Sequence, residues 1–263
     1  MDGAGALLAA FDEQRARMPH SLPDGVVAER DGPLVRTTGW AGGGFVEHRA
    51  LGGLDGAELD ALIARQVRVF AARGERFRWK LYGHDLPADL PRRVEAAGLV
   101  PGEQDALLAG DAAALASEPA PPAGVVLRET ASAADIARIA ALQERIWGDD
   151  YGWLPGVLGA RAALDPRALR IVVAEAGGEI VSAAWLRLDR ATPFAGLYGG
   201  VTLPEWRGRG IYGALVAHRA TVAAERGYRY LRVDASPESR PILERLGFVA
   251  ITTVTPHAWT PPD

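Results

Sequence analysis

The pattern of apolar and polar residues occurs twice along this chain, in the same order. Val26–Val35 and Val172–Val181 each predict two short strands joined by a tight turn at a glycine. Ala61–Arg76 and Ala214–Arg229 align without a gap, and each predicts an amphipathic helix that ends near an Arg-Gly pair. The residues of the second helix that we expect to face a core are Leu215, Val216, Val222 and Ala223. Repetition in one order predicts two copies of one structural unit.

Each predicted helix leads into a strand and then into a short helix. The strands are Arg76–Gly83 and Tyr228–Ala235, and the short helices lie within Arg92–Val100 and Pro241–Val249. The second copy is longer, because helical stretches at Ala134–Trp147 and about Leu154–Ala163 precede its first strand. This mixture of hairpins, helices and single strands predicts the α+β (α/β) class.

A stretch rich in proline and small residues divides the two copies. Pro119, Pro121 and Pro122 lie in it among alanines, which is typical of a semi-extended linker. We therefore expect a first domain over residues 1–110, a linker over 111–124 and a second domain over 125–263.

Composition narrows the classes of partner and compartment. The net charge of −4 gives no indication of general binding to nucleic acid or to an anionic membrane. Neither a signal peptide nor an apolar run of membrane-spanning length is apparent. The absence of cysteine excludes disulfides, thiolate metal sites and a cysteine nucleophile. We expect a cytoplasmic protein that binds no metal, no nucleic acid and no membrane, with a homodimer as a candidate assembly.

The two copies differ where the long helix begins. The second copy reads "EWRGRGIYGAL" over Glu205–Leu215, whereas the aligned stretch Leu54–Asp60 of the first copy has three acids and no arginine. The start of a helix attracts anions through its free N–H groups and its dipole. Acids at this position stabilise an ordinary helix, whereas arginines and glycines there favour a bound phosphate. We therefore expect an anion at the second copy and none at the first.

A dinucleotide such as NAD(P) is one candidate for this anion. Gly208, Gly210 and Gly213 spell G-x-G-x-x-G, and Asp234 follows about 20 residues later, as a ribose-binding acid would. However, Leu203–Arg207 separate the strand from the first glycine, and too few strand-helix units follow for that fold. An acyl-coenzyme A is the second candidate, and the third possibility is a glycine-rich turn with solvated arginines that binds no anion.

The order of elements in the second copy, with its loop, resembles the GCN5-related N-acetyltransferase (GNAT) family. The family's loop pattern, [Gln/Arg]-x-x-Gly-x-[Gly/Ala], is matched from Arg207 to Ile211, with Tyr212 where a small residue is usual. Ile242–Phe248, "ILERLGF", resembles the family's closing segment. The resemblance covers about residues 125–256, and the first copy looks like a shortened, degenerate version.

The resemblance implies two units of this kind, each with a twisted, mixed but mostly antiparallel sheet flanked by helices. It implies acetyl-coenzyme A as co-substrate, held between the splayed strands Ala195–Leu203 and Tyr228–Ala235. Free backbone groups of Val201 and Leu203 would pair with the pantetheine, and the loop would hold the pyrophosphate. The expected coenzyme-binding residues are Val201, Thr202, Leu203, Arg207, Gly208, Arg209, Gly210, Ile211, Tyr212, Gly213 and Ser239.

The implied reaction is direct attack of an amine on the thioester, with a small molecule rather than a protein as the acceptor. In the family a tyrosine usually acts as the general acid, and this chain has Leu243 at that position. An asparagine frequent in the family is replaced here by Ser236. The catalytic candidates are therefore Tyr198 and His257.

For the acceptor, Asp149 and Asp150 beside Trp153 would suit a cationic amine. The missing tyrosine leaves a second hypothesis open, a non-catalytic acyl-coenzyme A sensor or interaction module.

Overall fold

The computed structural model describes residues 3–19 and 21–262. The chain forms two compact units. The first comprises Met1–Leu107 and Ala250–Asp263, and the second comprises Leu108–Val249.

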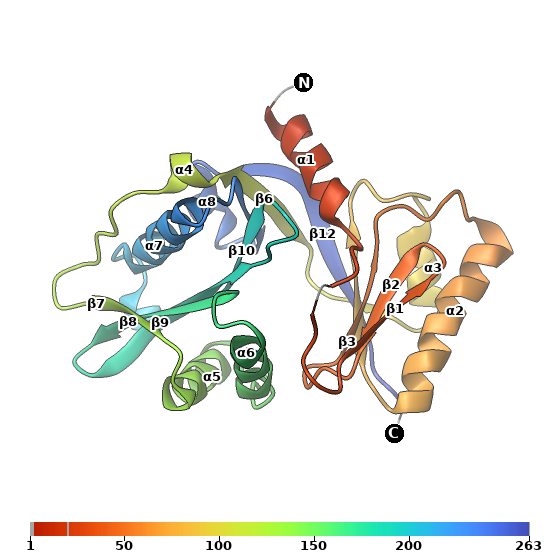
Figure 1. Cartoon of the computed structure of the whole chain (residues 1–263), viewed down its shortest axis with the longest axis horizontal. Helices are drawn as coiled ribbons and strands as arrows, with labels where there is room; N and C mark the ends of the chain where they lie inside the picture. Colours follow the sequence, from red (N-terminus) through yellow and green to blue (C-terminus); the bar gives the residue numbers. More distant parts are fainter. Residues whose placement is uncertain (1–2, 20, 263) are drawn as a thin grey trace. The chain divides into compact units, whose positions relative to one another are not determined.

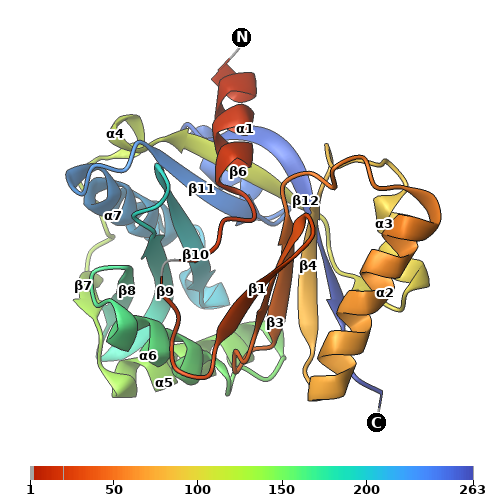
Figure 2. The same cartoon turned by 45° about the vertical axis from the view of Figure 1, so that its right-hand side comes forward.

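The first unit is a mixed sheet with helices packed on it. Its strands follow the order β1-β2-β3-β4-β12, β5 also pairs with β12, and only the β3–β4 pair among those with described register is parallel. The helices α2 and α3 lie on one side of this sheet (Figure 2). The strands are β1 (Val27–Asp31), β2 (Leu34–Thr38), β3 (Gly44–His48), β4 (Phe77–Tyr82), β5 (Val100–Pro101) and β12 (Val249–Trp259), and the helices are α1 (Gly3–Gln14), α2 (Gly56–Arg73) and α3 (Leu90–Ala96).

Local sequence explains why α2 begins and ends where it does. Asp55 accepts a hydrogen bond from the Gly56 N–H at 2.6 Å, and Gly74 ends the helix with φ 63°. Between these caps, Leu59, Leu62, Ile63, Gln66 and Phe70 are buried at helical spacing. The caps at its two ends and the burial of its apolar face therefore both stabilise α2.

The second unit has six neighbouring strands in the order β6-β11-β10-β9-β8-β7. Of the pairs with described register, β10–β11 is parallel and the others are antiparallel. The helices α5 and α6 cover one face of the sheet and α7 covers the other (Figure 1). The elements are β6 (Asp105–Asp111, which crosses the boundary between the units), α4 (Ala112–Leu115), β7 (Val126–Thr130), α5 (Ala133–Trp147), α6 (Leu154–Leu164), β8 (Leu169–Ala176), β9 (Glu179–Leu188), β10 (Phe194–Thr202), the 3₁₀ turn Pro204–Trp206, α7 (Ile211–Glu225), β11 (Tyr230–Ala235) and α8 (Arg240–Arg245).

The predicted repetition is confirmed in the order of elements. A hairpin, a third strand, a long helix, a strand parallel to the third, and a short helix follow one another in β1–α3 and again in β8–α8. The α+β class, with mixed sheets flanked by helices, is confirmed as well. Within α7, Leu215, Val216 and Ala223 are buried as predicted, but Val222 is only half-buried.

The boundaries between the two compact units do not coincide with the predicted linker. The expected linker 111–124 contains the helix α4, and residues 250–263 belong to the first unit although the sequence assigned them to the second domain. The division into a first domain over 1–110 and a second over 125–263 stays a prediction about the repeated copies. Within the described residues, no helix is both long and apolar enough to cross a membrane.

Candidate functional site

The central strands β10 and β11 pair over only part of their length. Their parallel register covers Phe194–Gly196 against Tyr230–Arg232. Both strands then continue, β10 to Thr202 and β11 to Ala235. From Gly196 and Arg232 onward the two strands are therefore neighbours without a described register. An extended ligand could lie between them, since unpaired backbone edges accept a further strand.

An irregularity in β10 accompanies this separation. The register of β10 against β9 shifts between Tyr198 and Val201, and Gly199 has φ 59°, a conformation that favours glycine. A Cβ at Gly199 would come within 1.9 Å of the Trp185 ring. The Gly199 carbonyl accepts a hydrogen bond from Gln143 Nε2 at 3.0 Å. The bulge is thus held by α5 and by β9, and it bends β10 where the pairing with β11 stops.

The expected phosphate loop lies directly after β10. Gly210 stands at the start of α7 with φ 84° and makes no side-chain cap, and the first turn of α7 has no acid. The backbone bond from Ala214 N–H to the Gly210 carbonyl, at 3.0 Å, is the first of the helix. The N–H groups of residues 211–213 precede it, so they point out of the helix end, where an anion binds favourably.

The corresponding helix start in the first unit is closed by its own charges. Asp55 caps α2 and Glu58 lies in its first turn. The Arg93 guanidinium lies 3.2 Å from Asp55, 2.8 Å from Asp60 and 2.8 Å from Asp89, and it also donates to the Gly56 carbonyl. These acids and this arginine occupy the start of α2, whereas the equivalent start of α7 has no such side chains. That the first copy binds no coenzyme stays a prediction.

The two loop arginines differ in what they contact. Arg207 Nε donates to the Thr202 carbonyl at 3.1 Å, so this side chain fastens the turn to the end of β10. Arg209 lies over the Trp206 ring, with its Cζ 4.8 Å from the ring centroid, and is exposed. Arg209 therefore presents its charge outside the loop, whereas Arg207 also has a structural role.

Tyr212 lies between the separated strands and α8. A Cβ at Gly200 would come within 2.9 Å of the Tyr212 Cε2 atom, so its ring lies against β10. Burial raises the pKa of Tyr212, and the nearby Arg219 charge and the Ser239 side chain oppose that shift. The hydroxyl therefore stays protonated at neutral pH. Ser239 itself stands at the start of α8 and donates to the Ser236 carbonyl at 3.3 Å.

The backbone of β10 requires one correction. The Leu203 N–H donates to the Val181 carbonyl at 2.9 Å, so it points toward β9 and is not free for a ligand. Because successive backbone groups alternate in direction along a strand, those of Thr202 point the other way, toward β11. Val201 shares the direction of Leu203, and its carbonyl accepts from Ser182 Oγ at 2.5 Å. The sequence could not show this alternation, since it depends on the bulge.

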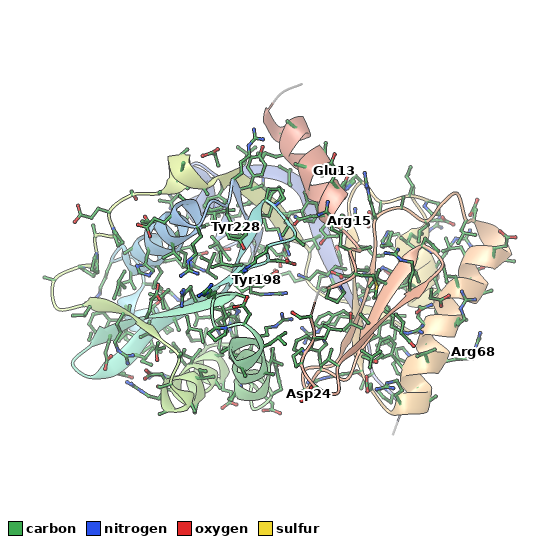
Figure 3. All side chains as sticks on the ribbon, viewed as in Figure 1. Glu13, Arg15, Asp24, Arg68, Tyr198 and Tyr228 are labelled. Atoms are coloured by element: carbon green, nitrogen blue, oxygen red, sulfur yellow. The ribbon has the colours of Figure 1, made fainter. Side chains whose placement is uncertain are left out.

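Of the two catalytic candidates, the structure brings only Tyr198 to the separated strands. Tyr198 lies on β10, two residues beyond the last paired position (Figure 3). His257 is buried in the first unit, with Nε2 3.5 Å from Glu95 and Nδ1 3.3 Å from the Thr255 carbonyl. Leu243, at the position of the usual tyrosine, is fully buried in α8.

The predicted acceptor residues lie in the loop between α5 and α6. Asp150 accepts from the Gly152 N–H at 2.8 Å, and its carbonyl accepts from Trp153 Nε1 at 3.1 Å, so this aspartate organises the turn. Asp149 is exposed. The Trp153 ring stacks on Tyr151 at 5.8 Å. Their role in binding an acceptor stays a prediction.

Three arginines that were not predicted from the sequence surround Tyr198. Arg232 Nη2 donates to the Tyr198 hydroxyl at 2.9 Å, and the Arg187 Cζ lies 5.0 Å from the centroid of the tyrosine ring. Arg161 of α6 is close enough for its pKa to respond to Arg187 and Tyr198. The available signal was weak, because a single arginine on a strand or a helix is also typical of a solvated face.

The second unit of the chain is similar to a known protein family. Residues 135–248 match the model of the Acetyltransferase (GNAT) family. This segment includes α5 to α8, the separated strands and the loop. No protein of curated function matches the chain.

Solved structures resemble the whole chain and not only this segment. A GCN5-related N-acetyltransferase from Kribbella flavida has 20% identity and a TM-score of 0.66, with 99% of this chain and 95% of that chain covered. A protein of unknown function from Staphylococcus epidermidis ATCC 12228 has 14% identity and a TM-score of 0.64, covering 92% of this chain and 96% of that one. A tandem GNAT protein from the clavulanic acid biosynthesis pathway has 15% identity and a TM-score of 0.62, covering 99% and 96%. At these identities the likeness establishes the fold of both units.

Proposed function

We propose that the protein transfers an acetyl group from acetyl-coenzyme A to an amine of a small molecule, because residues 135–248 match the model of the Acetyltransferase (GNAT) family. One observation carries the proposal. The strands β10 and β11 separate beyond Gly196 and Arg232, and the N–H groups that begin α7 are open beside them. An extended arm that ends in a pyrophosphate fits both features at once.

The reaction requires no covalent enzyme intermediate. The amine nitrogen attacks the thioester carbon, the C–S bond breaks, and the departing thiolate takes up a proton while the new amide loses one. The Tyr198 hydroxyl and the bulge at Gly199 lie where β10 leaves β11, so we assign the acyl group to that point. The fixed backbone dipoles of a bulge stabilise a developing oxyanion without reorganisation.

Coenzyme binding is tested with two variants at one position. Gly213 is the third residue of α7, a Cβ there meets no atom within 4 Å, and it aligns with Asp60 of the first copy. Gly213→Asp copies the acid of the sister helix, and Gly213→Ala is its matched control. Both substitutions favour the helix, so a loss of binding cannot be attributed to unfolding.

We expect calorimetric titration with acetyl-coenzyme A to show equal affinity for the wild type and Gly213→Ala, and at least about tenfold weaker binding for Gly213→Asp. A carboxylate about 5 Å from a phosphate repels it by about 1–3 kcal/mol. Equal affinity in all three proteins would overturn the assignment of the loop. A thermal shift with NADPH but none with acetyl-coenzyme A would favour the dinucleotide.

Turnover is measured separately, as free thiol released in the presence of a panel of amines. Release above the rate of thioester hydrolysis supports the transferase. The buried Leu243 favours the second candidate, a coenzyme sensor, since it removes the usual proton donor. Tight coenzyme binding with no amine turned over is the result expected of that sensor.

A further inference from the structure

A row of residues crosses the sheet of the second unit where β10 and β11 begin to separate. Gly196 of β10 is opposite Arg187 of β9 on one side and opposite Arg232 of β11 on the other. Residues opposite one another in a sheet point to the same face, so both guanidinium groups lie on one face of the sheet. Adjacent strands are about 4.8 Å apart, so the two arginines are separated by about 10 Å at their backbones.

The Tyr198 ring fills the space between these arginines. A Cβ at Gly196 would come within 2.5 Å of Tyr198 Cε2, so the ring lies directly over that glycine. The Cζ atoms of Arg187 and Arg232 are 5.0 Å and 5.9 Å from the ring centroid, and Arg232 donates to the hydroxyl at 2.9 Å. The ring and the two guanidiniums therefore form one layer.

A third guanidinium comes from α6, on the same face. Burial lowers the pKa of Arg161 to about 9, the Arg187 charge adds to this effect, and Tyr198 and Asp189 oppose it. Arginine holds its proton strongly, so the buried group keeps its charge and gains from an anion beside it.

Two acids of the same strands lie near these arginines. Asp189 lies just after the end of β9 and is exposed, and Asp234 follows Arg232 by two residues on β11 and is partly buried. An ammonium group suits Asp234, and an anionic group suits the guanidiniums of Arg161 and Arg187.

We propose that the acceptor amine also carries a carboxylate, and that Arg161 and Arg187 bind this carboxylate while the amine lies toward Tyr198. The proposal rests on the acetyltransferase function proposed above and names its substrate class. Arg232 is a positioning residue, because it holds the Tyr198 hydroxyl. The guanidinium fork matches a carboxylate in geometry as well as in charge, which makes such a site selective.

The test uses pairs of amines that differ only in charge. Amino acids with the amine at different distances from the carboxylate are compared with their carboxamides and with the matching aminophosphonates, by thiol release with the full-length protein. We expect at least about 30-fold higher kcat/KM for one or more amino acids than for the carboxamide twin. Binding of the same amines in the presence of coenzyme A is measured by calorimetry and should follow the same order.

Two variants and a control assign the preference to the arginines. Arg161→Gln and Arg187→Gln should each raise KM for the amino acid at least about tenfold, reduce the preference for the amino acid over its carboxamide, and leave coenzyme affinity unchanged. Arg190→Gln removes an exposed arginine three residues after Arg187 and should change none of these values.

Several results would overturn the inference. They are equal turnover of carboxamides or polyamines, preference for the phosphonate twin, failure of every amino acid to bind or react, and weaker coenzyme binding in the arginine variants. Equal turnover of amines that lack a carboxylate would contradict this inference but would still support the proposed acetyltransferase function. Absence of coenzyme binding would sink the proposed function itself.

Discussion

At the scale of single residues, two glycines of β10 determine what the site contains. Gly196 leaves the space that the Tyr198 ring occupies, and Gly199 adopts the positive φ of the bulge. From the sequence alone, nothing distinguishes these two glycines from the other residues of the strand "FAGLYGGVT". Their role follows from which side chain lies above each of them, and this is set by the register with β9.

We expect Gly196→Ala to destabilise the second unit by about 1–3 kcal/mol, because the added methyl group collides with the Tyr198 ring. The backbone of Gly196 is not in the positive-φ region, so the cost comes from this collision. Chemical denaturation measures the change. In the background of Tyr198→Ala the same substitution should cost less than about 0.5 kcal/mol. Additive effects of the two substitutions would show that the ring does not occupy this space.

At the scale of elements, ion pairs fasten the edge of the second unit's sheet to the helix α5. Arg128 of β7 bonds Asp135 of α5 at 2.7 and 3.1 Å and Glu175 of β8 at 2.6 Å. Thr130 Oγ1 also donates to Asp135, at 2.7 Å. Hydrogen bonds from Arg128 and from the Thr130 and Ser132 side chains hold the pKa of Asp135 well below its usual range.

We expect Asp135→Asn to cost about 1–3 kcal/mol at pH 7, because it removes charge-assisted hydrogen bonds from a nearly buried group. The carboxylate has a lower pKa in the folded than in the unfolded protein. Its contribution is therefore full above about pH 4 and is lost as the pH falls through the lower, folded value.

Thermal unfolding of the wild type and Asp135→Asn over a pH series checks this expectation. The difference in Tm should be largest at neutral pH and should narrow below about pH 4. Glu179→Gln is the matched control, because the Arg145–Glu179 pair is exposed and should contribute less than about 1 kcal/mol. A Tm difference between wild type and Asp135→Asn that is constant with pH would contradict the role given to the Asp135 charge.

At the scale of the whole chain, the last strand belongs by packing to the first unit. β12 pairs in antiparallel register with β4, from Val254 opposite Tyr82 to Trp259 opposite Phe77. Trp259 is buried in the core with Phe77, Leu99 and residues of α2. The chain thus leaves the first unit, forms the second, and returns to complete the first.

We expect the fragment 1–110 to remain unfolded when expressed alone, because β4 lacks its partner strand and the core lacks Trp259. Joining residues 1–107 to 250–263 through a short glycine-serine linker should restore the near-ultraviolet circular dichroism of a packed core. In that fusion Trp259→Ala should cost about 3–5 kcal/mol. A folded fragment 1–110, or a fusion no more stable than it, would contradict this account.

The sequence by itself determined the repeated order of elements and the chemical contrast between the two helix starts. Both are local properties, since apolar periodicity, capping acids and glycine-arginine patterns act within a few residues along the chain. It also predicted Tyr198 and the phosphate loop as parts of one site.

Three features became visible only in the folded chain: the direction of the backbone groups of β10, the unit that β12 completes, and the arginines around Tyr198. These features depend on strand register and on contacts between distant segments. A shift of one residue in register turns every side chain of a strand to the other face. The sequence therefore predicted a loop for the coenzyme, whereas the cluster of arginines around Tyr198 became apparent only once β9, β10, β11 and α6 were brought together.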